Sequence, residues 1–400
     1  MKKTLIALAA LAVVSAASAQ STVTLYGVLD MGVTQSKDTN TGPLPWGNLA
    51  KDSSDSYIGI SKGGALSSNR LGFKGTEDLG SGMKADFVYE LGINPDVQAA
   101  TAFSTRLGNV GLSGNFGAVT MGVQYTPYFN VQAAMDLYGN NNAVGYIVLN
   151  HTHKRNSNAV NYATPNIGGF SANFQVGTQA DAQVVTTTAG NLVVTPPNTQ
   201  SPTVLAAGRE GKAYGMNAIY AAGPLVAGFA YDYVSNPNGP TTATGFVGIN
   251  GTGPALGGFG AQTNVTGLAP LTYATTASDS VATWAVGASY DFRVVKASLA
   301  YSSLTDALAG RSNLTSKGYN LSVAAPFGAV TVLGNFGTAN LEGGFNNLDG
   351  KVLGYQVGVN YALSKRTTVY ALTGLEKLDI TAYNVEFKKE QTSVGVRHTF

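Results

Sequence analysis

Few side chains in this chain are of types that do chemistry. The 400 residues include no cysteine and three histidines, and 12% are charged. The lack of cysteine excludes a disulfide scaffold, a cysteine-ligated zinc site and a thiol enzyme. His151 and His153 could share one face of a strand and hold a metal, but the sequence offers no further evident ligand beside them. We therefore expect no metal, no cofactor and no enzymatic activity.

The charged residues that remain stand beside apolar ones. Arg70 and Lys74 alternate with Leu71 and Phe73, and Glu90 and Arg106 have similar apolar neighbours. Such groups could form ion pairs, or could bias the passage of small ions if one structure turned them to a common side. Their direction depends on the elements that carry them.

The chain alternates with the period of β-strands. From 352 to 361, large apolar residues such as Tyr355 and Val357 take the odd positions, and small or polar residues take the even positions except Val352. The same split recurs at 170–177, 225–233, 284–291, 319–324 and 393–400. After the first twenty residues no apolar run reaches the length of about 20 that a membrane helix needs.

The connections alternate between short and long. Short turns are predicted at 77–82, 113–115, 166–169, 222–224, 291–293, 326–328 and 363–365. Long loops are predicted at about 35–56, 94–104, 125–155, 179–211, 235–281, 303–316, 338–350 and 376–389. Seven turns and eight loops join sixteen strands. We predict an all-β fold, a 16-stranded antiparallel transmembrane β-barrel with short periplasmic turns and long extracellular loops.

Physical constraints favour that barrel over its alternatives. A sheet that spans lipid must close on itself, and sixteen strands leave a lumen too wide for side chains to fill. A secreted β-sandwich would also alternate but rarely contains so many regular strands, and the fixed repeat of a β-helix is not found. The formal net charge of +2 argues against nucleic-acid binding.

The first nineteen residues have the pattern of an export signal. Lys2 and Lys3 precede an apolar stretch from Leu5 to Val14, and Ala17-Ser18-Ala19 fits a cleavage site before Gln20. We expect residues 1–19 to be removed and residues 20–400 to form one barrel domain.

Alternation also predicts where the charged side chains point. An ionised side chain that faces mid-membrane lipid costs about 2–4 kcal/mol, so the lumen is favoured. We place Arg70, Lys74, Glu90, Arg106 and Arg155 on the lumen side, with Leu71, Phe73, Tyr89, Leu107 and Val160 toward lipid. Each arginine could alternatively only stiffen the wall through an ion pair, for example with Glu90.

Five segments and the chain end carry a family pattern: Val23–Gly27, Ser68–Gly80, Val110–Gly114, Phe116–Thr120, Asn158–Phe170 and the terminal Phe400. They resemble the proteobacterial general-diffusion porin family, of the trimeric sixteen-stranded type. The resemblance covers nearly the whole chain after residue 19. It implies a homotrimer in the bacterial outer membrane, in contact with membrane lipid and lipopolysaccharide. It also implies that Phe400 is read by the barrel-assembly machinery.

The resemblance further implies that the third loop, about 125–155, folds into the barrel and narrows it. The segment Gln124–Tyr128 resembles the family's loop entry, and the loop interior holds Asn140, Asn141, Asn142 and one acid, Asp136. The resemblance places Arg70, Arg106 and Arg155 at the family's basic wall cluster. Together with Lys74, Glu90 and Asp136 they form the expected constriction. We predict passive diffusion of ions and small hydrophilic solutes with a mild anion preference.

Two other functions stay open on the sequence alone. A substrate-specific channel for sugars, phosphate or organic acids would show an aromatic path or a dense arginine ladder along the lumen. An adhesive barrel would use large polar loops such as 235–281, which is rich in Gly, Thr and Asn.

Overall fold

Sixteen strands account for most of the chain in the computed structural model. It describes residues 22–41, 53–60, 65–96, 103–138, 154–179, 185–188, 191–194, 211–235, 278–308, 312–343, 348–381 and 384–400. The predicted signal sequence, His151, His153 and most of the 235–281 loop lie outside these residues. Among the described residues, no helix is long and apolar enough to cross a membrane.

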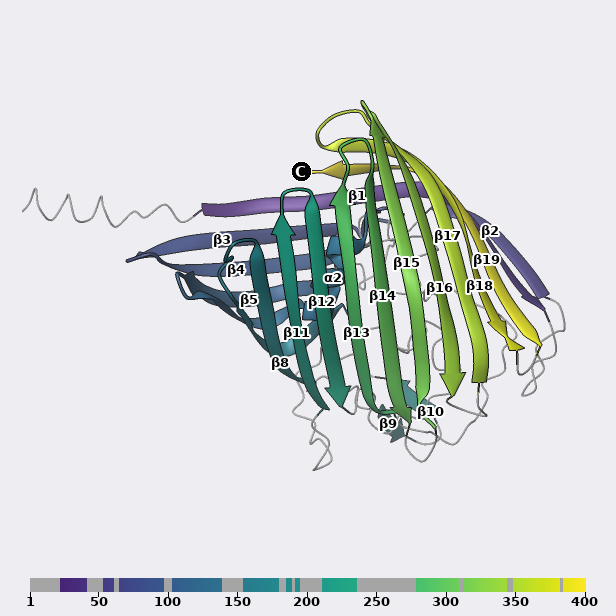
Figure 1. Ribbon diagram of the computed structural model, residues 1–400, viewed down its shortest axis with the longest axis horizontal. Coiled ribbons are helices and arrows are strands. Elements are labelled where there is room, and N and C mark those ends of the chain that lie inside the picture. The colour runs from purple at the N-terminus through teal and green to yellow at the C-terminus, as the bar shows by residue number, and fades with distance from the viewer. Residues whose placement is uncertain are drawn as a thin grey trace, which may run out of the picture.

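The strands pair in chain order and form a closed antiparallel ring. They are β1 (Thr22–Thr41), β3 (Arg70–Gly80), β4 (Met83–Ile93), β5 (Phe103–Gly114), β6 (Gly117–Tyr125), β7 (Arg155–Ala163), β8 (Phe170–Gln179), β11 (Gly211–Ala222), β12 (Leu225–Ser235), β13 (Ser278–Asp291), β14 (Lys296–Leu308), β15 (Leu314–Phe327), β16 (Val330–Gly343), β17 (Leu348–Ala362), β18 (Thr367–Ile380) and β19 (Val385–Thr399). Figure 1 shows β11–β17 as long neighbouring strands. The predicted 16-stranded barrel is confirmed.

The two ends of the chain close the ring. β1 pairs with β19 from Val28↔Thr399 onward and with β3 through its first half. Phe400 adds the last rung, since its N–H and C=O each bond to Gly27 at 3.1 Å. A β-carbon at Gly27 would collide with the Phe400 ring, so a glycine is required at this rung.

All seven short turns lie where the alternation predicts them, between β3/β4, β5/β6, β7/β8, β11/β12, β13/β14, β15/β16 and β17/β18. The predicted extent of three long loops is wrong. Strands continue through most of 303–316, 338–350 and 376–389, and only 309–313, 344–347 and 381–384 connect them. Beyond the bilayer both faces of a hairpin can be polar, so the ladder continues after the apolar alternation has ended.

Three shorter strands lie wholly or partly within predicted loops. β2 (Ser53–Ile60) pairs with the far part of β1, along the same edge that β3 uses nearer the chain start. β9 (Val185–Thr188) and β10 (Asn191–Val194) form a separate two-stranded sheet.

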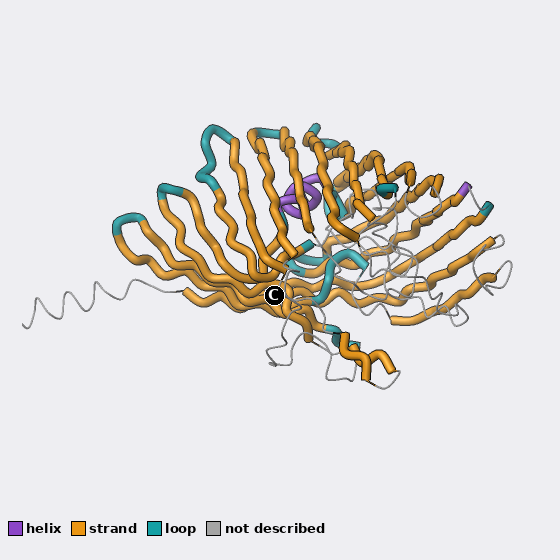
Figure 2. Tube along the Cα trace, turned by 90° about the horizontal axis from the view of Figure 1, so that it is seen from below, coloured by secondary structure: helices purple, strands orange, loops and turns teal. Residues whose placement is uncertain are grey.

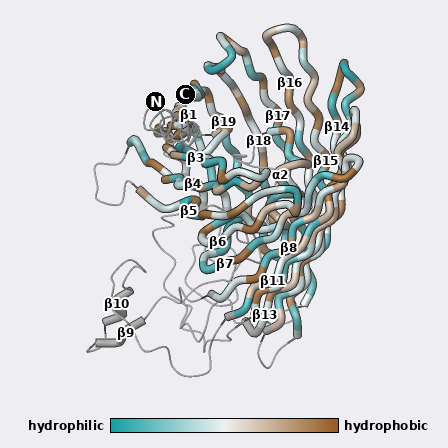
Figure 3. The backbone as a smooth tube through the Cα atoms, turned by 90° about the vertical axis from the view of Figure 1, so that its left-hand side faces the viewer, coloured by the Kyte–Doolittle hydropathy of each residue, from teal (hydrophilic) through white to brown (hydrophobic). Residues whose placement is uncertain are grey.

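The outer and inner faces of the ring have opposite chemistry. Along β17, Tyr355, Val357 and Val359 are exposed outward, whereas Gly354 and Gln356 are buried inside. Figure 3 shows brown and paler segments succeeding one another along the strands. An aromatic band follows the outer wall through the ring pairs Tyr214–Tyr233, Trp284–Tyr301 and Tyr301–Tyr319. Such bands mark the interface between lipid and water.

One helix, α2 (Pro127–Met135), follows β6. It lies inside the curve of the strands rather than on the outer surface (Figure 2). The sequence analysis missed this helix. Nine residues are too few for a helical period to emerge, although Thr126 followed by Pro127 is a helix-start signal.

Unequal effects on stability are expected from one new charge on the two faces of β7. Val160, 41% exposed, faces outward, and the adjacent Asn161 bonds to Asn173 on the inner face. We expect Val160→Arg to lower the free energy of unfolding in lipid by about 2 kcal/mol or more near mid-membrane. Asn161→Arg, the matched control, should leave it within about 0.5 kcal/mol. Urea titration of folded barrels in vesicles measures both. Equal losses in the two variants would contradict the assigned faces.

Candidate functional site

Helix α2 begins at a well-defined cap. The Thr126 side chain accepts the Phe129 N–H at 3.1 Å, and Pro127 occupies the first turn, where its missing N–H is harmless. The helix ends at Met135, and Asp136 follows it. The segment Tyr125–Tyr138 therefore leaves the wall as a short rigid rod.

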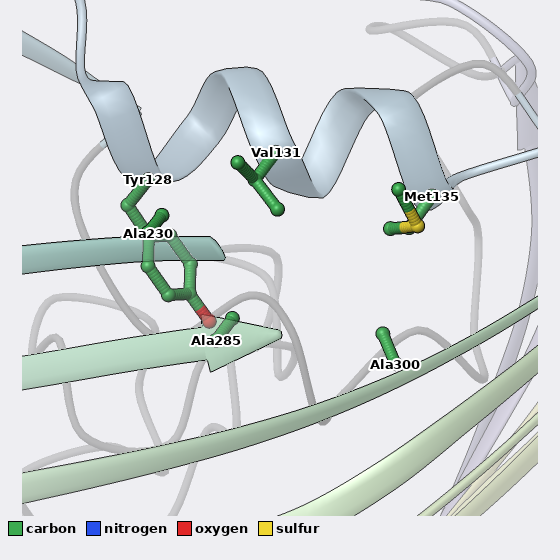
Figure 4. Close-up of a cluster of buried hydrophobic side chains, with 6 residues drawn as sticks. All are labelled: Tyr128, Val131, Met135, Ala230, Ala285 and Ala300. Atoms are coloured by element: carbon green, nitrogen blue, oxygen red, sulfur yellow. The ribbon is translucent and has the colours of Figure 1, made fainter. Parts of the chain in front are cut away.

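Small wall residues provide the seat for this rod. Tyr128, Val131 and Met135 project onto Ala230, Ala285 and Ala300 of β12–β14 (Figure 4). A β-carbon at Gly287 would lie 3.0 Å from Met135 Cγ, and one at Gly215 would lie 2.8 Å from Pro127 Cδ. The small residues on the inner parity of these strands thus create a shallow trough for the helix.

Polar wall side chains hold the rod along its length. Gln175 on β8 donates to the Tyr125 carbonyl at 2.9 Å, and Asn217 on β11 donates to the Pro127 carbonyl at 2.8 Å. Asp232 on β12 accepts bonds from the Thr126 hydroxyl and the Tyr128 N–H. Further along, Ser298 on β14 donates to the Met135 carbonyl, and the Tyr138 hydroxyl donates to the Leu333 carbonyl on β16 at 2.8 Å. The third loop therefore runs along the inner wall from β6 to β16.

A buried carboxylate, Glu90, is the hub of a charged cluster at the loop entry. It is 4% exposed on the inner face of β4. Arg106 Nε donates to one carboxylate oxygen at 2.6 Å. The other oxygen accepts the Tyr26 hydroxyl at 3.0 Å and lies 3.8 Å from Arg70 Nε. Lys74 Nζ lies 5.5 Å above the Tyr26 ring.

Tyr125 is the second hub. Its hydroxyl accepts a bond from Arg106 Nη2 at 3.2 Å, and the Arg155 guanidinium lies 5.5 Å above its ring. The ring also stacks on Phe129 at 4.6 Å, and Lys154 lies 5.9 Å from the Phe129 ring. Aromatic faces attract cations, so they hold these side chains apart and in fixed orientations.

The cluster carries excess positive charge. Arg70 and Arg106 contact Glu90, and Lys74, Lys154 and Arg155 lie over the neighbouring aromatic rings. Burial lowers the pKa of the Lys154 ammonium, and the charges of Arg155 and Arg106 lower this pKa further against a weaker opposing effect of Asp136. The cluster is therefore a site of concentrated positive charge that Glu90 offsets in part.

Five of the six predicted constriction residues, Arg70, Lys74, Glu90, Arg106 and Arg155, lie at this cluster. Asp136 is apart from Glu90, at the far end of helix α2, where its carboxylate accepts the Tyr138 N–H at 2.8 Å. Lys154, Tyr26, Tyr125 and Phe129 were not predicted as site residues. Lys154 could have been found, because it adjoins Arg155 in the sequence. The described residues contain no group of three metal-binding side chains.

Simple alternation was the expected reason for the lumen side of Arg106, and this reason is wrong. Glu90 pairs with Leu107, and Leu91 with Thr105, so Arg106 is the extra residue of a β-bulge. Directly opposite residues share a face, which puts Leu107 on the lumen side with Glu90 and not toward lipid. The bulge, not simple alternation, turns Arg106 to the lumen. A second register shift, between Gly122 and Gln124, precedes the pairing of Tyr125 with Arg155.

A closed sixteen-stranded barrel with an apolar outer wall and a lumen narrowed by an inward loop defines an outer-membrane channel protein. Comparison with known proteins identifies the family of this channel protein. The model of the Gram-negative porin family matches residues 6–379, and the chain belongs to that family. It is a porin of the bacterial outer membrane.

Two relatives that are named as porins match the chain over their whole length. Outer membrane porin protein 32 of Delftia acidovorans is 31% identical, and the match covers 100% of both chains. An outer membrane porin protein of Bordetella pertussis is 29% identical, again over 100% of both. Among solved structures, the anion-selective porin from Comamonas acidovorans has a TM-score of 0.64 at 23% identity and covers 95% of this chain and 100% of its own. That structure supports the fold.

The seat of helix α2 is testable with thiols, because the chain has no cysteine. We expect Gly228→Cys with Val131→Cys to form a disulfide on mild oxidation, since a β-carbon at 228 lies 3.2 Å from Val131 Cγ1. Single-channel conductance should stay unchanged, because the helix already lies on the wall. Gly334→Cys with Val131→Cys is the control, since a β-carbon at 334 meets nothing within 4 Å. Alkylation and mass spectrometry count the free thiols. Two free thiols in the first pair after oxidation would contradict the seat.

Proposed function

We propose that this porin is a general-diffusion channel with a mild preference for anions. The observation that carries the proposal is the excess of five cationic side chains over one carboxylate at the loop entry. Two comparisons support it. The full-length relative of Delftia acidovorans is a porin, and the structurally similar protein of Comamonas acidovorans is described as anion-selective.

Size and charge act at the same place in this proposal. The third loop and the wall of β3–β7 bound the waist, so solutes pass beside Arg70, Lys74 and Arg155. A unit positive charge about 8 Å from the path attracts an anion, and repels a cation, by about 0.5 kcal/mol in unscreened water. Salt screening over about 8 Å reduces each effect to about 0.2 kcal/mol, so each uncompensated charge favours anions over cations roughly twofold. Glu90 offsets part of the field through Arg106 and Arg70, which keeps the preference mild. Asp136 moderates it further from the end of helix α2.

Two substitutions should shift selectivity in opposite directions. Arg155→Gln removes a cation that has no carboxylate in salt-bridge contact among the described residues, so the anion-to-cation permeability ratio should fall at least about twofold. Glu90→Gln removes the carboxylate that contacts Arg70 and Arg106, so the ratio should rise. Reversal potentials in planar bilayers under a salt gradient measure both effects. The effects should shrink near 1 M salt, where the screening length is about 3 Å.

Lys365→Gln, in a short turn between β17 and β18, is the control and should leave the ratio unchanged. A parent channel without anion preference, or no response to either lumen substitution, would overturn the selectivity proposal. Conductance that saturates with one anion but not with chloride would instead favour a substrate-specific channel.

We also propose that the protein is a homotrimer, and that β18, β19 and β1 contribute to its contact flank. A solved structure of the similar barrel OmpT of Vibrio cholerae is described as a trimer form. In the described part of these three strands, no Phe, Tyr or Trp faces outward before Phe400, whereas outward aromatics continue from β11 to β17. A wall that meets protein has no need of lipid-interface aromatics.

Single cysteines of equal exposure test this flank. Val33 on β1 and Val357 on β17 are each 52% exposed. With a short bismaleimide in vesicles, Val33→Cys should give covalent dimers, and Val357→Cys should stay largely monomeric. Equal yields from both positions would rule out this flank as the contact.

Three further roles belong to the same proposal. Residues 1–19 direct export and are removed, leaving one barrel domain. Phe400, whose ring is 40% exposed outward, is the residue that the barrel-assembly machinery reads. Outward lysines beyond the apolar band, Lys317 and Lys351 among them, contact the phosphates of lipopolysaccharide.

A further inference from the structure

The wall of the barrel is interrupted beside β1. β3 pairs with β1 up to Val28↔Arg70, and β2 pairs with it from Val33↔Ile60. Between these two paired positions β1 runs from residue 28 to residue 33, whereas the chain that faces it runs from residue 60 to residue 70. The facing segment is therefore longer than the stretch of β1 beside it. β2 and β3 are thus two parts of one strand line, broken where the chain leaves the sheet. Within the described residues the departing segment is Ala65–Asn69, here called the strap.

The strap lies inside the barrel. Ala65 and Leu66 are buried at 2% and 1% exposure. They pack with Leu333, Tyr370 and Leu372 of β16 and β18 and with Tyr138 of the third loop. The strap therefore meets the third loop at Tyr138, away from the loop entry at Tyr125.

A single carboxylate holds the strap. Asp30 is fully buried on the inner face of β1, in the stretch that neither β2 nor β3 pairs. One of its oxygens accepts the N–H groups of Leu66 and Ser67 at 2.9 and 2.7 Å. The other accepts the Tyr370 hydroxyl at 2.6 Å. Carboxylates that accept several N–H bonds make some of the strongest hydrogen bonds in proteins.

The same residue also connects the strap to the basic cluster. The Asp30 N–H donates to the Asn69 side-chain oxygen, which replaces the missing rung of the ladder. The Asn69 carbonyl accepts the Ile93 N–H at 3.2 Å, and the next residue is Arg70. The end of the strap thus sets where Arg70 enters the wall.

From these contacts we propose that the strap is a second constriction element and that Asp30 is its positioning residue. The third loop narrows the lumen from β6 to β16, and the strap closes the interval from Tyr138 back to β1. Solutes are then confined to the passage beside the basic wall. This inference rests on the proposed channel function, and it adds a second segment that sets the size limit and the contact with the arginines.

Releasing the strap should widen the passage and weaken selectivity together. Asp30→Ala removes the three accepted bonds while the β1–β19 ladder stays intact. We expect single-channel conductance to rise about 1.5-fold or more, a larger polyethylene glycol to enter, and the reversal potential to move toward zero. Leu66→Ser releases the strap without changing any wall residue, so it tests the proposal if Asp30→Ala does not fold.

A matched control separates this effect from general loosening. Asp78→Ala removes a carboxylate that accepts a backbone N–H, from Gly80 at 2.8 Å, in an exposed turn. It should behave as the parent. Parent-like conductance and size limit in both Asp30→Ala and Leu66→Ser would overturn the strap proposal. That result would overturn the strap proposal alone if the parent channel is anion-selective and Arg155→Gln lowers its selectivity. A parent that forms no channel would sink both proposals.

Discussion

The lack of hydrogen-bond partners in lipid governs this structure. Each backbone N–H and C=O in the bilayer must find a partner in the protein, so a sheet there has no free edge. The ring meets this demand with antiparallel pairs between neighbouring strands, with the Gly27–Phe400 rung at the seam, and with the bond from the Asp30 N–H to Asn69 where β2 and β3 separate. Outside the bilayer the demand is relaxed, because water bonds to edges and loops. The paired hairpins of β14–β19 accordingly extend past the apolar band, and β2 adds to β1 only in its far part.

Closing sixteen strands creates a second problem, a lumen that the wall cannot fill. Segments that narrow it must bring their own backbone polar groups into a confined space. Helix α2 satisfies most of its own groups, and wall side chains such as Gln175, Asn217 and Asp232 bond the rest. Asp30 does the same for the strap. The inner wall is therefore polar where it holds loops, and it is formed of Gly and Ala where the helix must lie close.

The basic cluster shows how like charges are kept at one place. Five cations so close together repel one another, and Glu90 offsets part of this repulsion through Arg70 and Arg106. The rings of Tyr26, Tyr125 and Phe129 separate the charges and attract each of them weakly. This arrangement costs stability. It also leaves a positive electrostatic potential in the lumen, and a channel that selects ions by charge requires such a potential. Functional sites commonly break the rules of stability in this way.

Period-two alternation is a local property, and the sequence by itself determined what depends on it: strand number, the short turns, and the lumen side of Arg70, Lys74 and Glu90. Only the tertiary structure decided the features that depend on contacts between distant strands. A one-residue bulge against Glu90 turns Arg106 inward, and the trough for helix α2 combines β11–β14. The strap depends on Asp30 and Tyr370, which stand 340 positions apart. No local pattern encodes such a pair, because the ring brings the two residues together only when it closes.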